Sequence, residues 1–506
     1  MTVDIPKPVL VRALPLEGLA DAIHVELGLG GRIAHLTARK RPDGLTLIAV
    51  MMPAGGHGIE LWEADIEPDA TTYRSLTPRV SQVHWYERYI WDMFGLCPEG
   101  HPRLKSLILH EAWPSGYHPL SETRDIEDFA EAPARSYEFL EVHGDGIYEI
   151  PVGPIHAGII EPGHFRFSCV GEVIQNLEIR LGYQHRGIET MLQAAPINRL
   201  PLLAESIATD TPVGNALAHA RAMEQVAGLQ LTPAAVWLRA LALEIERVAS
   251  HVSDLGGICA DIGYIGGAAA FSKLRGRVLG LGERLTGTRL QTSFVVPGGV
   301  RIPLTDKLRT SIGAEAEGVE KDFRRAQPRL LETFGALERM DGAGKVKLSL
   351  ARDFGLVGPA GRASGIAYDV REWLNEEPYS TLGWEPATGD QGDVLARVTM
   401  RCDEVRASLS IIHGILETLP NGNPLPISRI QRLPANSVGI GTVEAWRGEL
   451  VHTIITGNDG NIERYAIKDP STNNWTGLAI AVRGRLVTDF PLCNKSFSLS
   501  YSGNDL

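Results

Sequence analysis

Three short segments that contain glycine or proline carry the side chains best suited to moving protons. They read Gly153-Pro-Ile-His-Ala-Gly158, Glu161-Pro-Gly-His-Phe165 and Arg180-Leu-Gly-Tyr-Gln-His-Arg-Gly-Ile-Glu189. An imidazole delivers protons near neutral pH, so His156 and His164 are candidate proton donors. His156 is the better candidate, because Gly158 lets a ligand approach the backbone beside it. The alternative for His164 is an ordinary hydrogen-bonded loop histidine.

A charged set in and after these segments is suited to stabilising a developing negative charge. Its members are His185, Arg186, Glu189, Arg199, Glu205 and Asp210. A guanidinium steadies an anionic product through its charge and its directed hydrogen bonds. The alternative is that the arginines form salt bridges with Glu189 or Glu205 and serve packing alone. For His251, one helical turn after Arg247, a structural role is favoured.

The cysteines argue against a nickel or Fe–S centre held by this chain alone. Cys97, Cys169, Cys259, Cys402 and Cys493 are dispersed and never form a CxxC pair. Such centres need a set of thiolate ligands, which this spacing does not offer. Reduced and mostly buried thiols are therefore expected. The sequence also lacks a GxxxxGK[ST] loop, so it predicts no nucleotide site.

Composition and charge are those of a globular protein with two or more domains. Its 506 residues are too many for one ordinary core, and 22% of them are charged. The net charge of −12 argues against nucleic acid as the main partner, because phosphate binding needs a basic face. No apolar run reaches the roughly 18–20 residues that cross a bilayer, and no signal peptide is visible. We expect a cytoplasmic chain that reaches a membrane through partner subunits.

The apolar periodicities predict an α+β fold. Residues 9–65 alternate short apolar runs with breaks, which favours an open sheet, and a helix-like segment ends at Gly95. Longer helices are expected at Pro233–Leu255, Leu274–Thr286, Leu304–Leu337 and Asp390–Thr418. Gly256-Gly257 is expected to end the first of these, and residues 438–487 are strand-like. The predicted division is a small domain at 1–120, a linker at 121–146 and a large domain at 147–506.

Ordered motifs along the chain resemble two subunits of respiratory complex I fused into one. Residues 87–105 (ERYIWDMFGLCPEGHPRLK) resemble the signature of the 30 kDa subunit. The segments at 153–158, 180–189, 244–251 and 444–449 resemble the 49 kDa subunit and the large subunits of group 4 nickel-iron hydrogenases of the formate-hydrogenlyase and hydrogenase-4 type. The element at 161–165 favours the hydrogenase branch. The resemblance implies a small α/β domain followed by a large, mainly helical domain with a β-rich C-terminal part.

The same resemblance implies a nickel-iron site, but its ligand positions hold other residues. The family has two motifs with a cysteine pair each, and this chain has residues 206–215 and 496–506 in their place. The four cysteine positions hold Ala208, Thr211, Ser500 and Gly503. Alanine and glycine cannot ligate a metal, and neutral hydroxyls bind soft metals weakly. Hydrogenase activity is therefore not expected. Asp505 either reaches across this former metal pocket or belongs to a frayed end.

The positions that resemble the quinone site of complex I also differ. Leu202 stands where that family has a tyrosine, and Ile258 where it has a histidine near its terminal Fe–S cluster. His156 fits the first of two loop histidines in that family. The second has become Ile160 or is replaced in space by His164. The usual proton donors for quinone reduction are therefore incomplete.

The resemblance implies the large, electron-transferring subunit of a membrane-associated oxidoreductase complex, without H2 chemistry. The expected partners are a small subunit with a 4Fe–4S cluster, similar to the 20 kDa subunit of complex I, and antiporter-like membrane subunits on the cytoplasmic side. Arg186 and Arg199 match arginines near that cluster, and His185 and Glu189 are expected beside it. Electrons would pass to an acceptor, with quinone as one candidate. His156, His164 and Arg199 are the expected catalytic residues.

Two other functions compete with this hypothesis. One is a catalytically silent subunit that couples or holds the assembly together, although a pure scaffold would not need so many polar loops. The other is an active hydrogenase with a new kind of metal site, which the absence of any cysteine pair disfavours.

Overall fold

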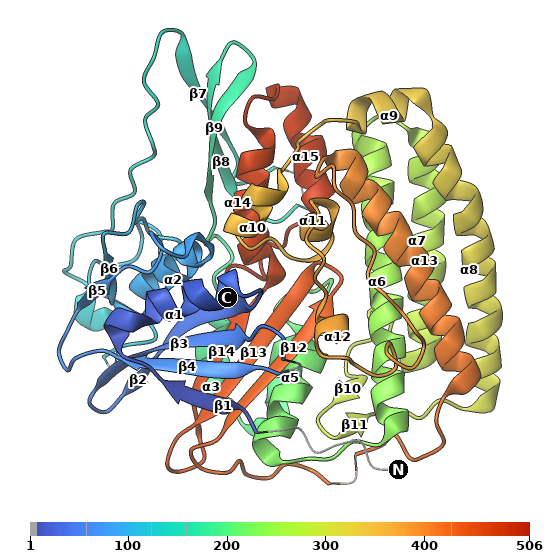
Figure 1. Cartoon of the computed structure of the whole chain (residues 1–506), viewed down its shortest axis with the longest axis horizontal. Helices are drawn as coiled ribbons and strands as arrows, with labels where there is room; N and C mark the ends of the chain where they lie inside the picture. Colours follow the sequence, from blue (N-terminus) through green and yellow to red (C-terminus); the bar gives the residue numbers. More distant parts are fainter. Residues whose placement is uncertain (1–7, 57, 123, 157–159, 427) are drawn as a thin grey trace.

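The computed structural model describes residues 8–56, 58–122, 124–156, 160–426 and 428–506. Two sheets from opposite ends of the chain lie side by side near the centre, and a bundle of long helices stands beside them (Figure 1). A three-stranded sheet projects from the opposite side of the molecule (Figure 1). The predicted α+β fold is therefore confirmed. Within the described ranges, no helix combines the length and apolar character needed to span a bilayer.

The N-terminal sheet has the strand order β1-β4-β3-β2. Its strands are β1 (Leu10–Ala13), β2 (Arg32–Arg41), β3 (Gly44–Met52) and β4 (Glu60–Asp65). The apolar run Leu47–Met52 in β3 is fully buried, as expected for a strand covered on both faces. Helices α1 (Leu16–Gly28) and α2 (His84–Phe94) pack against this sheet, and β2 also contacts the C-terminal sheet. The predicted open sheet is present.

Helix α2 ends at Gly95, as the sequence predicts. Gly95 has a φ of 74°, and a Cβ there would lie 2.7 Å from the ring of His118. Glycine is suited to this place because the backbone is left-handed and a ring closes over it. The short strands β5 (Thr72–Arg74) and β6 (Cys97–Glu99) pair next to it, followed by irregular chain with a turn of helix at Ile126–Phe129.

The projecting sheet consists of β7 (Ile147–Val152), β8 (His164–Val170) and β9 (Val173–Arg180), all antiparallel. It leads into short helices and then into a longer helix that packs against the C-terminal sheet. These elements are α3 (Ile188–Ala194), a helical turn at Ile197–Arg199, α4 (Leu200–Glu205) and α5 (Pro212–Ala227). The loops around β8 and α3 hold the predicted site residues, so this region positions the candidate site.

Four long helices form the bundle (Figure 1): α6 (Pro233–Asp261), α7 (Ile265–Thr286), α8 (Asp306–Glu332) and α13 (Val394–Thr418). The predicted exit of α6 at Gly256-Gly257 is wrong, because the helix continues to Asp261. A Cβ at Gly256 would lie 3.3 Å from Phe271, and one at Gly257 would collide with Lys495. These glycines thus allow close packing inside the helix. The predicted single helix at 304–337 is interrupted at Thr333, where α9 (Phe334–Met340) begins.

The C-terminal part contains strands and helices. The antiparallel strands are β12 (Val438–Ala445), β13 (Gly448–Thr456) and β14 (Ile462–Lys468). The strand-like prediction for 438–487 is wrong after residue 469, because α14 (Pro470–Val482) follows, capped by the Asp469 carboxylate. Other elements are the short helices α10 (Leu348–Asp353), α11 (Gly358–Ala363), α12 (Val370–Trp373) and α15 (Phe490–Phe497), and the paired strands β10 (Val295–Val296) and β11 (Gly299–Val300).

The two central sheets are joined through Arg464 on β14. Its guanidinium donates to the Thr37 hydroxyl (2.8 Å) and the Ala38 carbonyl (2.9 Å) on β2, and it pairs with Glu189 on α3 at 2.7 Å. The side chains of Arg464 and Glu189 are both only 2% exposed. A buried ion pair of this kind depends on both members, because removal of one leaves an unpaired buried charge.

Replacement of Arg464 by methionine should therefore lower the free energy of unfolding by about 3–5 kcal/mol. Denaturant unfolding of the purified protein measures this change. Arg324, whose side chain is 71% exposed in a pair with Glu320, provides a matched control. Arg324→Met should shift stability by no more than about 0.5 kcal/mol. Equal effects of the two substitutions would contradict the role given to Arg464.

Candidate functional site

The last nine residues fold back into the protein. After α15 the chain turns at Ser498, which has a φ of 56°, and Ser500, Gly503 and Asp505 are then buried. Asp505 accepts hydrogen bonds from the backbone N–H groups of Gly182 (2.8 Å) and Gln184 (3.1 Å). The frayed-end alternative for Asp505 is therefore wrong. This carboxylate fixes the loop that carries His185 against the tail.

The loop before β8 holds the other side of the tail. The Glu161 carboxylate accepts hydrogen bonds from the N–H groups of Tyr501 (3.0 Å) and Ser502 (3.4 Å). A Cβ at Gly163 would collide with the Tyr501 ring, so this glycine allows the loop to lie against it. The segment at 161–165 thus forms one wall of the former metal pocket.

The four positions that correspond to nickel ligands are buried and filled by protein. Ala208, Thr211 and Ser500 are 1%, 3% and 2% exposed. The Ser500 hydroxyl accepts from the Gly503 N–H at 2.9 Å, and a Cβ at Gly503 would collide with the Asp469 carboxylate. Across the described ranges, no three His, Cys, Asp or Glu side chains are grouped as metal ligands. These residues do not fit a nickel-iron centre.

Arg447 connects the two segments where the cysteine motifs would lie. Its guanidinium donates to both carboxylate oxygens of Asp210 (2.8 and 2.7 Å), to the Thr211 hydroxyl (3.1 Å) and to the Ser498 carbonyl (2.5 Å). Trp446 lies against the guanidinium at 3.8 Å and donates its indole N–H to Thr211 at 3.0 Å. A bidentate arginine–carboxylate pair gives strong and directional bonding. Arg447 thus bridges the pocket from one side to the other.

The two candidate proton donors lie close together and bind backbone carbonyls. His156 contacts the Gly163 carbonyl at 2.8 Å, and His164 contacts the Gly153 carbonyl at 3.2 Å. His164 is 8% exposed, and its second ring nitrogen has no hydrogen-bond partner among the described residues. Burial lowers the pKa of His164, so its imidazole is neutral at pH 7. Gly158, which the sequence places beside His156, lies outside the described residues.

The predicted cationic residues lie at the edge of the same region. Arg186 is exposed and donates to the carbonyls of Ser206 and Ile207, each at 2.9 Å. Arg199 is also exposed, and its side chain has no partner among the described residues. Glu189 pairs with Arg464, so the alternative of a packing salt bridge from these arginines to Glu189 is wrong. The carboxylate of Glu205 accepts the Ser293 N–H at 2.5 Å instead of pairing with them.

His185 and the positions that differ from the complex I quinone site vary in their exposure to solvent. His185 is half-buried, and burial lowers its pKa. Leu202 and Ile160 are 54% and 50% exposed, whereas Ile258 is fully buried in the core. Leu202 and Ile160 thus present apolar side chains to solvent. The sequence does not reveal that Leu202 and Ile160 reach solvent, because this depends on how the loops fold.

The sequence motif at 444–449 contained Arg447, but sequence reasoning assigned it no role. The same is true of Asp469, which both caps α14 and lies against Gly503. A tryptophan–arginine pair followed by glycine was the available signal for Arg447. No local signal marked Asp469, because its contact with the tail joins residues 34 positions apart (503 − 469).

A side chain at position 503 should destabilise the tail. Gly503→Ala places a methyl group against the Asp469 carboxylate and should cost about 1–3 kcal/mol. Gly335→Ala is the matched control, because nothing lies within 4 Å of a Cβ there and the position is helical. The control should be neutral or stabilising by up to about 1 kcal/mol. Thermal and denaturant unfolding report both values; an unchanged Gly503→Ala protein would contradict the filled pocket.

Asp505 should make stability depend on pH. Burial raises the pKa of Asp505 to about 6, against 3.8 for an unperturbed aspartate. The unfolded chain therefore ionises this group at lower pH than the folded one, so its contribution to stability is lost as pH rises from 4 to above 6. The loss amounts to about 3 kcal/mol. Asp505→Asn should remove it, so the stability of the wild type relative to this variant should fall over that pH range. Parallel pH profiles would contradict the assignment.

Comparison with known proteins agrees with the motifs. The family model described as respiratory-chain NADH dehydrogenase, 30 Kd subunit, matches residues 36–130, and that of the 49 Kd subunit matches residues 261–437. Formate hydrogenlyase subunit 5 of Escherichia coli K12 is 32% identical, covering 88% of this chain and 80% of the relative. Hydrogenase-4 component G of the same organism is 30% identical, covering 88% and 77%.

A solved structure has the same fold. The membrane-bound sulfane sulfur reductase, an archaeal respiratory membrane complex, contains a chain that matches with a TM-score of 0.67 and 25% identity, covering 71% of this chain and 99% of that one. The fused arrangement predicted from the motifs is confirmed. The chain belongs to the group 4 hydrogenase large-subunit family, in which complex I-like 30 kDa and 49 kDa parts are joined, and it has no cysteine at the four nickel-ligand positions.

Proposed function

We propose that the chain is the electron-transferring large subunit of a membrane-associated oxidoreductase complex that does not handle H2. The filled pocket, where Arg447, Asp469 and the tail occupy the space of a metal centre, supports the absence of H2 chemistry. The observation that supports electron transfer is the pair of histidines, His156 and His164, that lies in the wall beside it. Several relatives are named as subunits of formate hydrogenlyase, hydrogenase-4 and NADH-quinone oxidoreductase. A subunit role in a complex of that kind is supported by these names.

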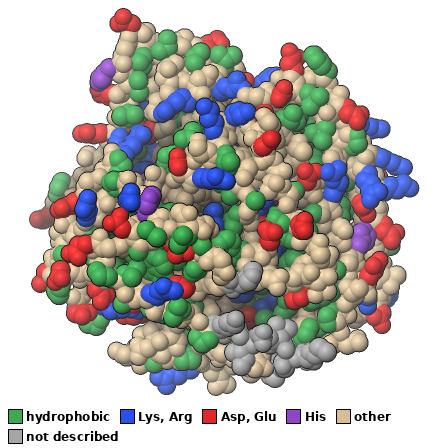
Figure 2. Space-filling view, in the orientation of Figure 1, with side chains coloured by type: hydrophobic (Ala, Val, Ile, Leu, Met, Phe, Trp, Pro, Cys, Tyr) green, Lys and Arg blue, Asp and Glu red, His purple; other side chains and the backbone are tan. Residues whose placement is uncertain are grey.

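The electron donor would be a 4Fe–4S cluster in a small partner subunit that docks at the exposed edge of the pocket. Arg186 and Arg199 are exposed there, and Leu202 adds an apolar contact. A guanidinium beside a cluster stabilises its reduced, more negative state. On the face drawn in Figure 2, acidic and basic side chains are interspersed. Antiporter-like subunits would then hold the assembly on the cytoplasmic side of the membrane.

The acceptor would receive electrons and protons near His156 and His164. Both imidazoles lie in the wall next to the tail, and a neutral imidazole can relay a proton to a reduced acceptor. Quinone is the first acceptor to test, since NADH-quinone oxidoreductase subunits are among the relatives. A sulfane sulfur compound is the second, because the structural relative is named as a sulfane sulfur reductase.

A structural or coupling role without chemistry is the second candidate. The filled pocket favours it, because Arg447 pairs with Asp210 and the tail occupies the space of a metal centre. The two candidates differ in one measurable way: only an electron-transferring subunit makes cluster oxidation depend on an acceptor.

The test uses the intact complex purified from membranes, with its Fe–S cluster reduced by chemical donors. Reoxidation followed by electron paramagnetic resonance should accelerate when quinone or polysulfide is added. The double variant His156→Gln/His164→Gln should slow that reoxidation by roughly 100-fold, as expected when positioned proton donors are lost. His24→Gln, at an exposed site on α1, is the matched control and should behave as wild type.

Two results would decide against the proposal. If no acceptor accelerates reoxidation in the wild-type complex, the structural role is correct. If the Fe–S cluster of the double variant is reoxidised as fast as that of the wild type, the electron-transferring role is kept, but the two histidines are not the proton donors.

A further inference from the structure

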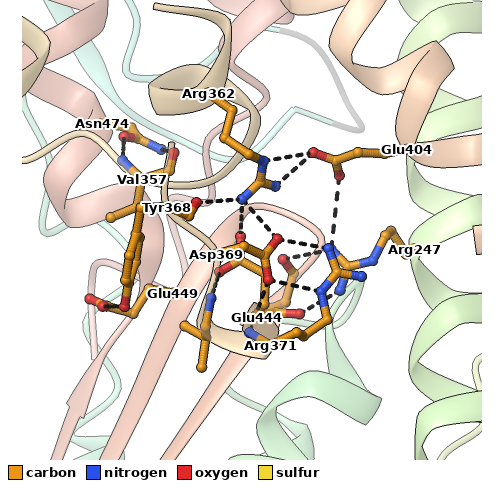
Figure 3. Close-up of polar contacts among 12 residues, drawn as sticks. Arg247, Val357, Arg362, Tyr368, Asp369, Arg371, Glu404, Glu444, Glu449 and Asn474 are labelled. Carbon is orange, nitrogen blue, oxygen red and sulfur yellow. Dashed lines mark hydrogen bonds and ion pairs between the residues drawn. The ribbon is translucent and has the colours of Figure 1, made fainter. Parts of the chain in front are cut away.

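A buried network of charges surrounds Arg362 on α11 (Figure 3). Its guanidinium binds the carboxylates of Glu404 (2.6 Å), Glu444 (2.7 Å) and Asp369 (3.0 Å). Arg371 binds Asp369 as well, at 2.8 Å. Each of these charged groups has an opposite charge beside it, as buried charges require. The network therefore has the pattern of a structural element, and a buried polar atom that lacks a partner is the better candidate for chemistry.

His164 on β8 carries such an atom. Its Nδ1 lies 3.2 Å from the Gly153 carbonyl. Because a carbonyl oxygen can only accept a hydrogen bond, Nδ1 holds the proton of the neutral ring and Nε2 carries a free lone pair. This Nε2 is buried and has no hydrogen-bond partner among the described residues. It is therefore the atom at which His164 takes up a proton and from which it passes one on.

The projecting sheet places His164 among charged side chains on one of its faces. Strands β8 and β9 pair His164 with Arg180 and Arg166 with Glu178. Because successive side chains of a strand point to opposite faces, these four lie on the face opposite to that of Phe165, which is buried in the core. His164 is thus on the face turned away from the core, so another segment must cover it.

Residues 137–140, which we call the strap, supply that cover. The ring of Phe139 lies against the His164 ring, with 5.3 Å between the ring centroids. The same ring carries the Arg166 guanidinium on its face, at 4.1 Å. The Tyr137 ring meets the Phe139 ring edge-on at 4.9 Å. Phe139 is half-buried, so its ring lies between His164 and the solvent.

The Glu178 carboxylate holds the strap on both sides of Phe139. It accepts hydrogen bonds from the Tyr137 hydroxyl (2.8 Å) and the Leu140 N–H (2.7 Å). It also pairs with Arg103 at 2.8 Å, in the part of the chain that matches the 30 Kd subunit. The Phe139 side chain has no hydrogen-bonding group, so ring contacts alone hold it in place. The ring can therefore swing away while the strap stays attached.

The surroundings keep the covered imidazole neutral. The charged groups that face it from the two strands are Arg166, Arg180 and Glu178, whereas Glu138 on the strap has an exposed side chain. Burial lowers the pKa of His164, the bond to the Gly153 carbonyl raises it, the two arginines lower it further, and Glu178 raises it. Burial is the largest of these effects, so exposure of the ring to water should raise the pKa.

We propose that Phe139 controls the access of water to Nε2 of His164 and thereby the supply of protons at this histidine. When the Phe139 ring swings away, an acid from the solvent protonates Nε2. The proposed function then takes that proton from the same nitrogen to the reduced acceptor, and the ring returns to its neutral form. One proton enters and one leaves at Nε2, and the histidine is neither oxidised nor reduced. Phe139 is a positioning residue, and the destination of the proton rests on the proposed function.

The access of water to Nε2 can be measured without any electron transfer. Diethyl pyrocarbonate acylates the unprotonated nitrogen of an imidazole, and peptide mass spectrometry of the treated, intact complex gives the rate at His164. Phe139→Ala should raise this rate roughly 10-fold, because an aromatic and a cation–π contact are lost. The pH midpoint of the reaction should also rise toward the ordinary histidine pKa of 6.5.

Two further variants make the labelling specific. Tyr137→Phe keeps the ring but removes its hydrogen bond to Glu178, so it should raise the labelling rate in the same direction by a smaller factor. Phe129→Ala is the matched control and should label as wild type. Phe129 is also half-buried and carries the Arg124 guanidinium at 4.4 Å, but its ring packs against Tyr117.

The link to proton supply is measured in the same complex by reoxidation of the reduced Fe–S cluster with quinone or polysulfide between about pH 5 and 8. A higher pKa keeps His164 protonated to higher pH. The pH at which reoxidation slows should therefore move upward in Phe139→Ala and stay at the wild-type value in Phe129→Ala. A variant that only loosens the fold would lower the rate without moving this pH.

The outcomes separate the cover from the function on which it depends. Wild-type labelling in both Phe139→Ala and Tyr137→Phe would overturn the inference, whatever the electron transfer does. Faster labelling with an unmoved pH profile would overturn the link to proton supply. A wild-type complex without acceptor-dependent reoxidation would overturn the proposed function, and the labelling would then decide on the cover by itself. If Phe139→Ala does not assemble, Tyr137→Phe decides by the same measurements.

Discussion

The Arg447 guanidinium is the contact on which the pocket depends, because it binds Asp210 and Thr211 in one segment and the Ser498 carbonyl in the other. In a nickel-iron enzyme of this family the two motifs would share metal ligands. Here the Arg447 guanidinium joins the two segments. The two segments can therefore keep their relative positions although every thiolate is gone.

This bridge explains why so much of the surrounding polar structure remains. Asp505 and Glu161 still hold the tail through backbone N–H groups, and Asp469 lies where a side chain at Gly503 would point. Buried charges are stable only when they are paired and hydrogen-bonded. Losing one member of such a pair leaves its own partner unpaired, so each pair depends on both of its members. The network around Arg362 follows the same rule on a larger scale.

Much of the fold could be predicted from sequence, because its signals are local. The period of apolar residues in α6 and α13 and the left-handed cap at Gly95 need no knowledge of distant contacts. The predicted end of α6 at Gly256 was wrong, because the glycine at this position allows close packing against Phe271. The same limit applies to the site. A comparison with the family's cysteine motifs reveals the replacements at Ala208, Thr211, Ser500 and Gly503. No motif reveals the partners of Arg447 and Glu189, because these come from segments far apart in sequence.

The central claim is that the pocket contains a guanidinium bridge in place of a metal and serves electron transfer without H2 chemistry. The most direct test is the nickel content of the intact complex, purified without chelators and measured by elemental analysis together with its Fe–S iron. The account predicts iron from the partner's cluster and nickel no higher than background. About one nickel per copy of this chain would contradict it.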